Sequence, residues 1–163
     1  MSDLESLIFD DPAVASRYLT ENGVAPIAGA DGWFDTGDMG YLDESGRLYV
    51  CGRTKDLIIV GGVNLYPTDI ERVAASVEGV RKGCVVAVRI EAGVNREGFA
   101  VLAEVYQPDD DQERSRLSRE ITARVLCQTG HSPREVKLLR PGALPKTPSG
   151  KLRRNDAREL LRN

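Results

Sequence analysis

A stretch of twenty residues, GRTKDLIIVGGVNLYPTDIE, constrains the fold of this chain more than any other part of the sequence. It begins at Gly52 with a short polar segment. The apolar and mostly β-branched run Leu57–Val60 follows and predicts a buried strand. Gly61 and Gly62 end that strand with residues that tolerate positive φ and let another molecule approach the backbone closely. The order of these features predicts a domain junction with a small-molecule site beside it.

The end of the same stretch predicts the start of a helix. Asn64–Pro67 turns the chain, and Thr68 with Glu71 three residues later has the spacing of a capping box. A stripe of apolar residues at helical spacing follows, and it consists of Ile70, Val73, Ala74 and Val77. We therefore expect a helix over residues 68–78.

A β-hairpin is predicted before this stretch. Gly40–Leu42 and Arg47–Val50 flank the turn residues Asp43–Gly46. The loop before the hairpin exposes Asp38 beside a threonine and a glycine, and a carboxylate can accept two hydrogen bonds from adjacent hydroxyls such as those of a ribose. The alternative is that Asp38 lies in an Asx-turn and accepts hydrogen bonds from its own backbone. Further upstream, Ala13–Thr20 could form a short helix, and residues 23–31 are rich in turn formers.

The second half of the chain alternates between strand and helix patterns. Strands are expected at Gly83–Ile90, Gly98–Tyr106 and Val136–Leu139, a long helix between the acids at 109–113 and Gly130, and a last short helix around Arg158–Leu161 that Asn155 could cap. The resulting βαββαβα pattern predicts an α+β domain of about one hundred residues, with a small three-stranded sheet and helices packed on it.

Composition excludes several functional classes. The chain has 163 residues, of which 41% are hydrophobic and 29% charged, and no apolar run is long enough to span a membrane. The three cysteines, Cys51, Cys84 and Cys127, have an irregular spacing that suits the reducing cytoplasm better than a disulfide framework or a zinc site. His131 is the single histidine and is expected on the surface without a role. We therefore predict no metal site built from this chain.

The charge of the chain is unevenly distributed. The net charge is -3, yet residues 134–163 hold nine Lys or Arg and three Asp or Glu, which makes this segment +6. Such a segment could meet phosphates, an acidic protein or nucleic acid, or it could be a solvated basic helix. Nucleic acid is the least favoured partner because the segment has no aromatic side chain to stack on bases.

The segment PGALPKTPSGKLRR, residues 141–154, is rich in loop-forming residues. Its tip places Lys151 after Gly150. The segment is not a phosphate-binding P-loop, because Leu152 stands where that motif requires Ser or Thr. We expect a mobile lysine on a flexible loop, suited to carry a positive charge to an oxyanion or a phosphate. The alternative is a solvated lysine.

Three motifs in one order carry a resemblance to a known family. The TGD loop with its hairpin, the GRTKD to TDIE stretch and PKTPSGKLRR together resemble the C-terminal part of the adenylate-forming ligases, which include acyl-CoA synthetases and fatty acyl-AMP ligases. The match covers about Asp31 to Arg154, and its wording is most similar to the fatty-acid-activating branch. It implies that residues 1–54 are the remnant of a large N-terminal adenylation domain, which is missing, and that residues 55–163 are the small mobile C-terminal domain.

The resemblance implies a role for six residues. Asp38 corresponds to the aspartate that binds the ribose hydroxyls of ATP, and Arg53 to the arginine that steadies the nucleotide. Lys55 falls at the hinge about which the small domain rotates. Gly61 and Gly62 correspond to the segment that lines the phosphopantetheine channel. The family's catalytic lysine corresponds to Lys151.

The implied function is that of an acid–thiol ligase that uses ATP, with Mg²⁺ in the full-length enzyme. It converts a carboxylic acid, here a fatty acid, to acyl-AMP and transfers the acyl group to a thiol of CoA or a carrier protein. The chain alone is expected to be inactive because the ATP phosphate loop and the acyl tunnel are absent from it. Two alternatives are a non-catalytic binding module of the same fold and a docking domain for carrier protein, in which Arg153 and Arg154 would meet an acidic carrier. Retention of Lys151 and Asp38 argues against a module without catalysis.

Overall fold

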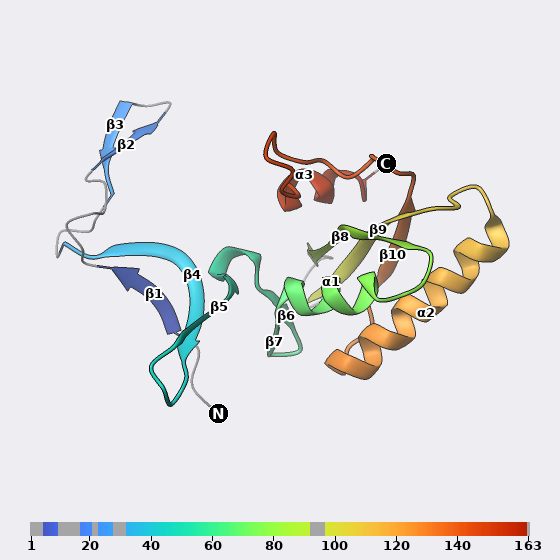
Figure 1. Cartoon of the computed structure of the whole chain (residues 1–163), viewed down its shortest axis with the longest axis horizontal. Helices are drawn as coiled ribbons and strands as arrows, with labels where there is room; N and C mark the ends of the chain where they lie inside the picture. Colours follow the sequence, from blue (N-terminus) through green and yellow to red (C-terminus); the bar gives the residue numbers. More distant parts are fainter. Residues whose placement is uncertain (1–4, 10–16, 21–22, 28–31, 92–96, 163) are drawn as a thin grey trace. The chain divides into compact units, whose positions relative to one another are not determined.

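The computed structural model describes residues 5–9, 17–20, 23–27, 32–91 and 97–162. The chain divides into two compact units, Met1–Lys55 and Asp56–Asn163 (Figure 1). Each unit has its own three-stranded sheet. The predicted domain boundary between residues 54 and 55, and with it the hinge at Lys55, stays a prediction.

The first unit contains an antiparallel sheet of three strands and a separate two-stranded hairpin. The sheet has the order β1 (Glu5–Phe9), β4 (Phe34–Leu42), β5 (Leu48–Arg53), and the second hairpin pairs β2 (Arg17–Thr20) with β3 (Gly23–Pro26). The structure shows a strand over Arg17–Thr20, so the helix predicted over Ala13–Thr20 is wrong in this part. Residues 13–16, the rest of that predicted helix, lie outside the described residues. An isolated helix this short is unstable, and pairing with β3 supplies Arg17–Thr20 with interstrand hydrogen bonds instead.

The predicted hairpin before Gly52 is confirmed as β4 and β5. Two backbone nitrogens of its tight turn donate to one side chain, because Oδ1 of Asp43 accepts hydrogen bonds from Ser45 N and Arg47 N, each at 2.9 Å. Tyr41 and Tyr49 lie directly opposite each other, and their rings stack with centroids 5.1 Å apart. These contacts fix the register of the hairpin.

The second unit confirms the predicted α+β class, with a three-stranded sheet and packed helices. Its sheet has the order β10 (Glu135–Leu139), β9 (Glu97–Val105), β8 (Val80–Glu91), with β8 antiparallel and β10 parallel to the central β9. The helices are α1 (Pro67–Ala75), α2 (Asp111–Thr129) and α3 (Arg154–Glu159), and β6 (Ile58–Val60) pairs with β7 (Val63–Leu65) as a hairpin. Most of the predicted loop at 92–98 lies outside the described residues.

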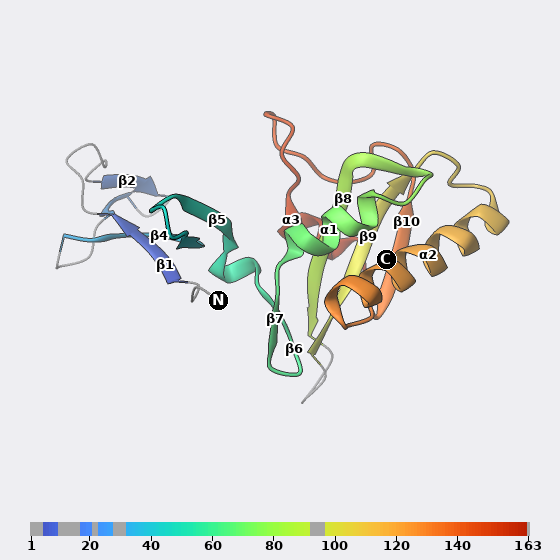
Figure 2. The same ribbon diagram turned by 60° about the horizontal axis from the view of Figure 1, so that its bottom comes forward.

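The central strand β9 is buried on both faces of the sheet (Figure 2). Phe99, Val101, Ala103 and Val105 alternate onto one face and join the core formed with α1 and α2. Ala100 and Leu102 point to the other face, where Leu144 and Ala157 of α3 cover them. Because side chains alternate along a strand, helices on both sides explain why the run Phe99–Ala103 within β9 is apolar.

The predicted capping box at the start of α1 is wrong. The helix begins at Pro67 after the N-cap residue Tyr66, which makes no capping hydrogen bond with its side chain. Proline at the first helical position has a φ angle already suited to a helix, so the helix starts before Thr68. Glu71 bonds Ala87 N and Arg154 instead. The predicted cap of the last helix is also wrong, since Asn155 lies inside α3 and Arg153 is its N-cap.

The ends of α2 match the sequence signals. Asp110 is the N-cap, and its carboxylate accepts hydrogen bonds from Gln112 N at 2.9 Å and Glu113 N at 3.0 Å. The helix ends at Gly130, which has the left-handed φ of 73°. His131 follows, half-buried, with its Nδ1 3.0 Å from Thr129 O.

We expect Asp110→Ala to lower the free energy of unfolding by about 1 kcal/mol, because two backbone N–H groups lose their acceptor. Asp111→Ala is the matched control, since it removes a neighbouring carboxylate that is not the N-cap. Urea unfolding of the chain and both variants measures the effect. Equal losses for the two variants would show that the general charge at the helix start matters and the cap does not.

Candidate functional site

Asp38 and Arg53 lie side by side on the β4–β5 hairpin. The strand register pairs the two residues, and Arg53 Nε donates a hydrogen bond of 3.0 Å to Asp38 Oδ1. Arg53 Nη2 also approaches Thr36 O at 3.4 Å. Among the described residues, Oδ2 of Asp38 has no hydrogen-bond partner. The ion pair is about half exposed, so the carboxylate can still accept hydrogen bonds from a ligand.

The Asx-turn in this region belongs to Asp35 and not to Asp38. Asp35 Oδ1 accepts a hydrogen bond from Gly37 N at 2.8 Å, and Gly37 has a positive φ of 69°. Asp38 instead donates its backbone N–H to Thr36 Oγ1 at 3.0 Å. The alternative interpretation of Asp38 as a turn residue is therefore wrong, and the side chain of Asp38 is directed to Arg53.

An open cavity of about 360 Å³ borders the ion pair within the first unit. Its lining consists of Asp35, Thr36, Gly37, Arg53, Thr54 and Lys55. Lys55 is exposed and lies in a short 3₁₀ turn over Thr54–Asp56. The cavity thus combines two cations with hydroxyl and carboxylate groups, a set that can bind a ligand with hydroxyls and negative charge.

Gly61 and Gly62 form the tight turn between β6 and β7. Their φ angles are 57° and 80°, which are values that other residues rarely adopt. A β-carbon at either position would meet no atom within 4 Å, so backbone conformation and not crowding within the described chain requires glycine here. The strand β7 continues after the turn, where the sequence indicated only a turn into the helix.

Lys151 lies in a hydrogen-bonded turn. Thr147 N donates to Lys151 O at 2.8 Å, Lys151 N donates to Thr147 Oγ1 at 3.1 Å, and Gly150 N donates to Thr147 O at 2.8 Å. The expected irregular loop is therefore more ordered than predicted, since Thr147 accepts through both its carbonyl and its hydroxyl. The Lys151 side chain is exposed, and its ammonium group forms no hydrogen bond or ion pair with the residues that the structure describes.

The turn with Lys151 and the turn with Gly61 and Gly62 lie at different ends of the second unit. In both views the segment 141–153, coloured orange to red, lies at the top beside α3, and the β6–β7 turn lies at the bottom (Figures 1 and 2). The two candidate elements therefore face different surroundings.

A fully buried glutamate anchors the segment before this turn. Glu104 on β9 has no exposed surface, accepts a hydrogen bond of 2.9 Å from Leu144 N and forms an ion pair with Arg81. Burial raises the pKa of the Glu104 carboxyl, but hydrogen bonds from the backbone N–H groups of Gly142 and Leu144 outweigh this and hold the pKa below its ordinary value of 4.5. Sequence reasoning missed Glu104, for which the only signal is an acid inside the apolar run of β9.

Four of the nine cations of the +6 segment form ion pairs with described residues. Arg140 pairs with Asp109, Arg153 with Asp156, Arg162 with Glu159, and Arg154 with both Asp56 and Glu71. Arg154 is half-buried. A docking surface built on Arg153 and Arg154 would therefore have to compete with these internal partners.

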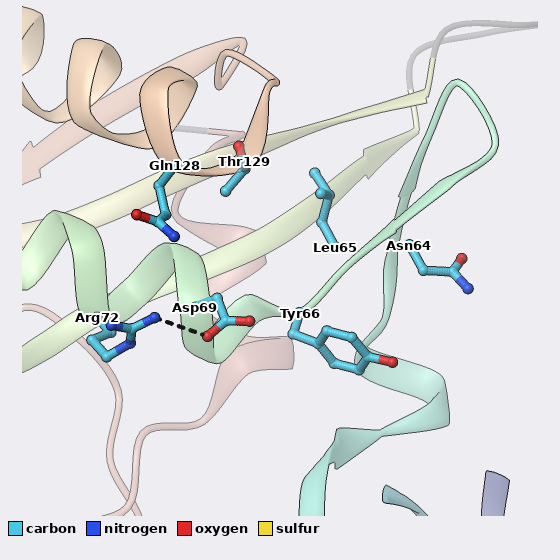
Figure 3. Close-up of a pocket in the computed structure, with 7 residues that line it drawn as sticks. All are labelled: Asn64, Leu65, Tyr66, Asp69, Arg72, Gln128 and Thr129. Atoms are coloured by element: carbon cyan, nitrogen blue, oxygen red, sulfur yellow. Dashed lines mark hydrogen bonds and ion pairs between the residues drawn. The ribbon is translucent and has the colours of Figure 1, made fainter. Parts of the chain in front are cut away.

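A second cavity, of about 270 Å³, lies between α1 and the end of α2. Figure 3 shows Asp69 and Arg72 on α1 facing Gln128 and Thr129, with the Asp69–Arg72 ion pair at 3.3 Å. Sequence reasoning did not predict this cavity, because its two sides come from segments about sixty residues apart.

Comparison with known proteins identifies the fold. No family model matches the chain. A solved structure from a study of fatty acyl-adenylate ligases from E. coli and L. pneumophila superposes with a TM-score of 0.67 at 36% identity, over 81% of this chain and 23% of that one. The second unit thus has the fold of the C-terminal domain of adenylate-forming enzymes.

Two curated relatives agree with this assignment. A protein of Mycobacterium tuberculosis that is named as a ligase is 51% identical over 144 residues, covering 88% of this chain and 26% of that protein. The 2-succinylbenzoate–CoA ligase of Listeria monocytogenes is 34% identical, over 98% of this chain and 32% of that protein. The chain is therefore related to the C-terminal part of adenylate-forming ligases, and it spans about a quarter to a third of the length of these relatives.

Proposed function

We propose that this chain is the C-terminal part of an ATP-dependent ligase that converts a carboxylic acid to acyl-AMP and transfers the acyl group to a thiol. The observation that carries the proposal is the exposed ammonium of Lys151, which has no partner among the described residues and is held on a hydrogen-bonded turn. In acyl-AMP formation a carboxylate attacks the α-phosphate and pyrophosphate leaves. A fixed ammonium beside the reacting oxygens offsets the negative charge that increases there.

The ion pair of Asp38 and Arg53 is proposed to bind the nucleotide. Oδ2 of Asp38, which no described residue bonds, can accept a hydrogen bond from a ribose hydroxyl, and Arg53 adds a positive charge beside the open cavity. The described residues contain no cluster of three or more His, Cys, Asp or Glu that could hold a metal ion. We therefore assign no residue of this chain to the Mg²⁺ that would accompany ATP.

Rotation of the second unit about Lys55 is proposed to alternate two active orientations. The Lys151 turn serves acyl-AMP formation, and the Gly61–Gly62 turn serves attack by the thiol of phosphopantetheine. The separate placement of these turns in the second unit supports this, because a change of orientation is then needed to exchange one for the other.

A fatty acid is the proposed substrate, and CoA or a carrier protein the proposed acceptor. The similarity to fatty acyl-adenylate ligases supports the fatty acid, and the similarity to a CoA ligase keeps CoA as an acceptor. No disulfide joins the cysteines Cys51, Cys84 and Cys127, which supports a cytoplasmic location for the ligase. No helix among the described residues has the length and apolar character needed to cross a bilayer.

The first test compares the chain alone with a chimera in which residues 32–163 replace the matching segment of a fatty acyl-adenylate ligase. With ATP and fatty acids of different lengths, we expect acyl-AMP from the chimera and none from the 163-residue chain. The reason is that the sequence holds no phosphate-binding loop of the kind that such ligases use for ATP. Acyl-AMP from the chain alone, or none from a folded chimera, would contradict the proposal.

A carrier-docking module is the second candidate function. Its support is the +6 charge of residues 134–163. Because Arg154 has internal partners, charge reversal there would disturb the fold, and Arg158 is the better test residue since it is exposed and has no ion pair within the described residues. Salt-sensitive binding of an acidic carrier protein that Arg158→Glu abolishes would favour docking, and binding that is independent of salt would oppose it.

A further inference from the structure

One arginine connects the Lys151 turn with the residue at which the second unit begins. Arg154 is the first residue of α3 and lies three residues after Lys151 in the sequence. Its Nη1 donates to Asp56 Oδ2 at 2.9 Å, and its Nη2 donates to Glu71 Oε1 at 2.8 Å and Oε2 at 3.1 Å. The three side chains are 27%, 16% and 18% exposed, in the order Arg154, Asp56, Glu71, so the network is largely shielded from water.

The same network also includes the sheet. Glu71 Oε1 accepts a hydrogen bond of 3.0 Å from Ala87 N on β8. One guanidinium thus links the 3₁₀ turn at Asp56, the helix α1 and, through Glu71, the strand β8 to the start of α3. Charge-assisted bonds with the fork geometry of arginine fix direction as well as distance, which a lysine could not do.

The Lys151 turn is held at both of its bases. Before the turn, Glu104 fixes Leu144. After it, Arg153 N donates to Pro145 O at 2.9 Å, which closes the base of the turn, and Arg154 joins that base to Asp56. Since Asp56 follows the proposed hinge residue Lys55, the link runs from the hinge side of the unit to the catalytic turn.

We propose that Arg154 is a positioning residue, which fixes the Lys151 turn to Asp56 so that the turn follows every rotation about the hinge as part of one rigid body. The part of this inference that concerns catalysis rests on the proposed function. Without the link, Lys151 keeps its charge but its ammonium samples more positions, and misplacement of a catalytic group by about 1 Å can cost up to about 100-fold in rate.

The test on the 163-residue chain is hydrogen exchange of the backbone amides at residues 147–153. We expect Arg154→Ala to accelerate exchange at least about tenfold, since the base of the turn is released. Arg154→Lys keeps the charge without the fork and is expected to give an intermediate effect. Arg162→Ala is the matched control, because its ion pair with Glu159 is exposed and lies outside the network. Unchanged exchange in a folded Arg154→Ala variant would overturn the link.

The test of the catalytic part uses the chimera. We expect Arg154→Ala to lower kcat for acyl-AMP formation about tenfold with little change in the KM for ATP, and to leave thioester formation from supplied acyl-AMP unchanged. Arg154→Lys is expected to restore part of the rate, and Arg162→Ala to have no effect. Equal losses in both half-reactions, or none, would overturn the positioning role. A parent chimera that forms no acyl-AMP would instead refute the proposed function, while hydrogen exchange would still decide whether the link exists.

Discussion

Replacement of Lys151 by alanine is expected to lower the rate of acyl-AMP formation by about 10²- to 10³-fold, the loss typical when a fixed electrostatic group is removed from a reacting centre. The reason is that the exposed ammonium has no partner among the described residues and is free to meet the reacting oxygens. Thioester formation from supplied acyl-AMP is expected to stay within about twofold, because the Gly61–Gly62 turn serves that step in the proposed mechanism.

The measurement uses the chimera with and without the substitution, with pyrophosphate release for the first half-reaction and thioester formation for the second. Lys82→Ala is the control, since Lys82 is also an exposed lysine and lies on β8, outside the Lys151 turn. Survival of both half-reactions in Lys151→Ala would remove Lys151 from the mechanism and favour the binding module. Loss of both would contradict the two-orientation mechanism.

The parts of the fold that the sequence predicted are those fixed by local patterns. The boundaries of α2 follow from Asp110 and Gly130, which act on backbone groups within a few residues of themselves. The hairpin β4–β5 follows from alternating residues around Asp43–Gly46. Such signals need no knowledge of distant segments, and they sufficed for the α+β class and for the three strands of the sheet.

The wrong capping box of α1 shows how a side chain distant in the sequence can compete with a local hydrogen-bond partner. Glu71 has the spacing of a capping residue, yet Arg154, which lies 83 positions away, takes its carboxylate. Arg17–Thr20 is a different case, because its partner β3 begins at Gly23 and the hairpin is itself a local alternative to the predicted helix. A local pattern specifies the best local structure, and a charged partner brought in by the fold can offer a stronger interaction.

The residues of the candidate site also include some that the sequence predicted and one that it did not. Asp38 and Arg53 were each predicted to bind the nucleotide. Their ion pair was not predicted, and it follows from the register of the hairpin, which places the two residues opposite each other. Glu104 could not be predicted from its neighbours, because a buried carboxylate is stable only if the fold supplies donors, here from β8 and from the segment after β10.

The second large effect is expected for Glu104→Ala, which should destabilise the second unit by about 3 kcal/mol. The substitution leaves the Arg81 guanidinium without its carboxylate and the buried Leu144 N–H without an acceptor. Urea unfolding of the chain at pH 7 measures the loss. Glu135→Ala, which removes an exposed glutamate from the neighbouring strand β10, is expected to change the free energy of unfolding by less than about 0.5 kcal/mol.

The pH dependence of this effect separates the charge of Glu104 from its packing. Because the pKa of Glu104 is lower in the folded chain than its ordinary value of 4.5, the charged form stabilises the fold above about pH 4.5, and this contribution is lost as the pH falls further through the folded pKa. The isosteric Glu104→Gln variant keeps an acceptor for Leu144 N and cannot ionise. Its difference in unfolding free energy from the parent chain should therefore shrink as the pH falls below 4.5. A difference that is independent of pH from 7 to 3 would mean that shape and not charge anchors the segment before the Lys151 turn.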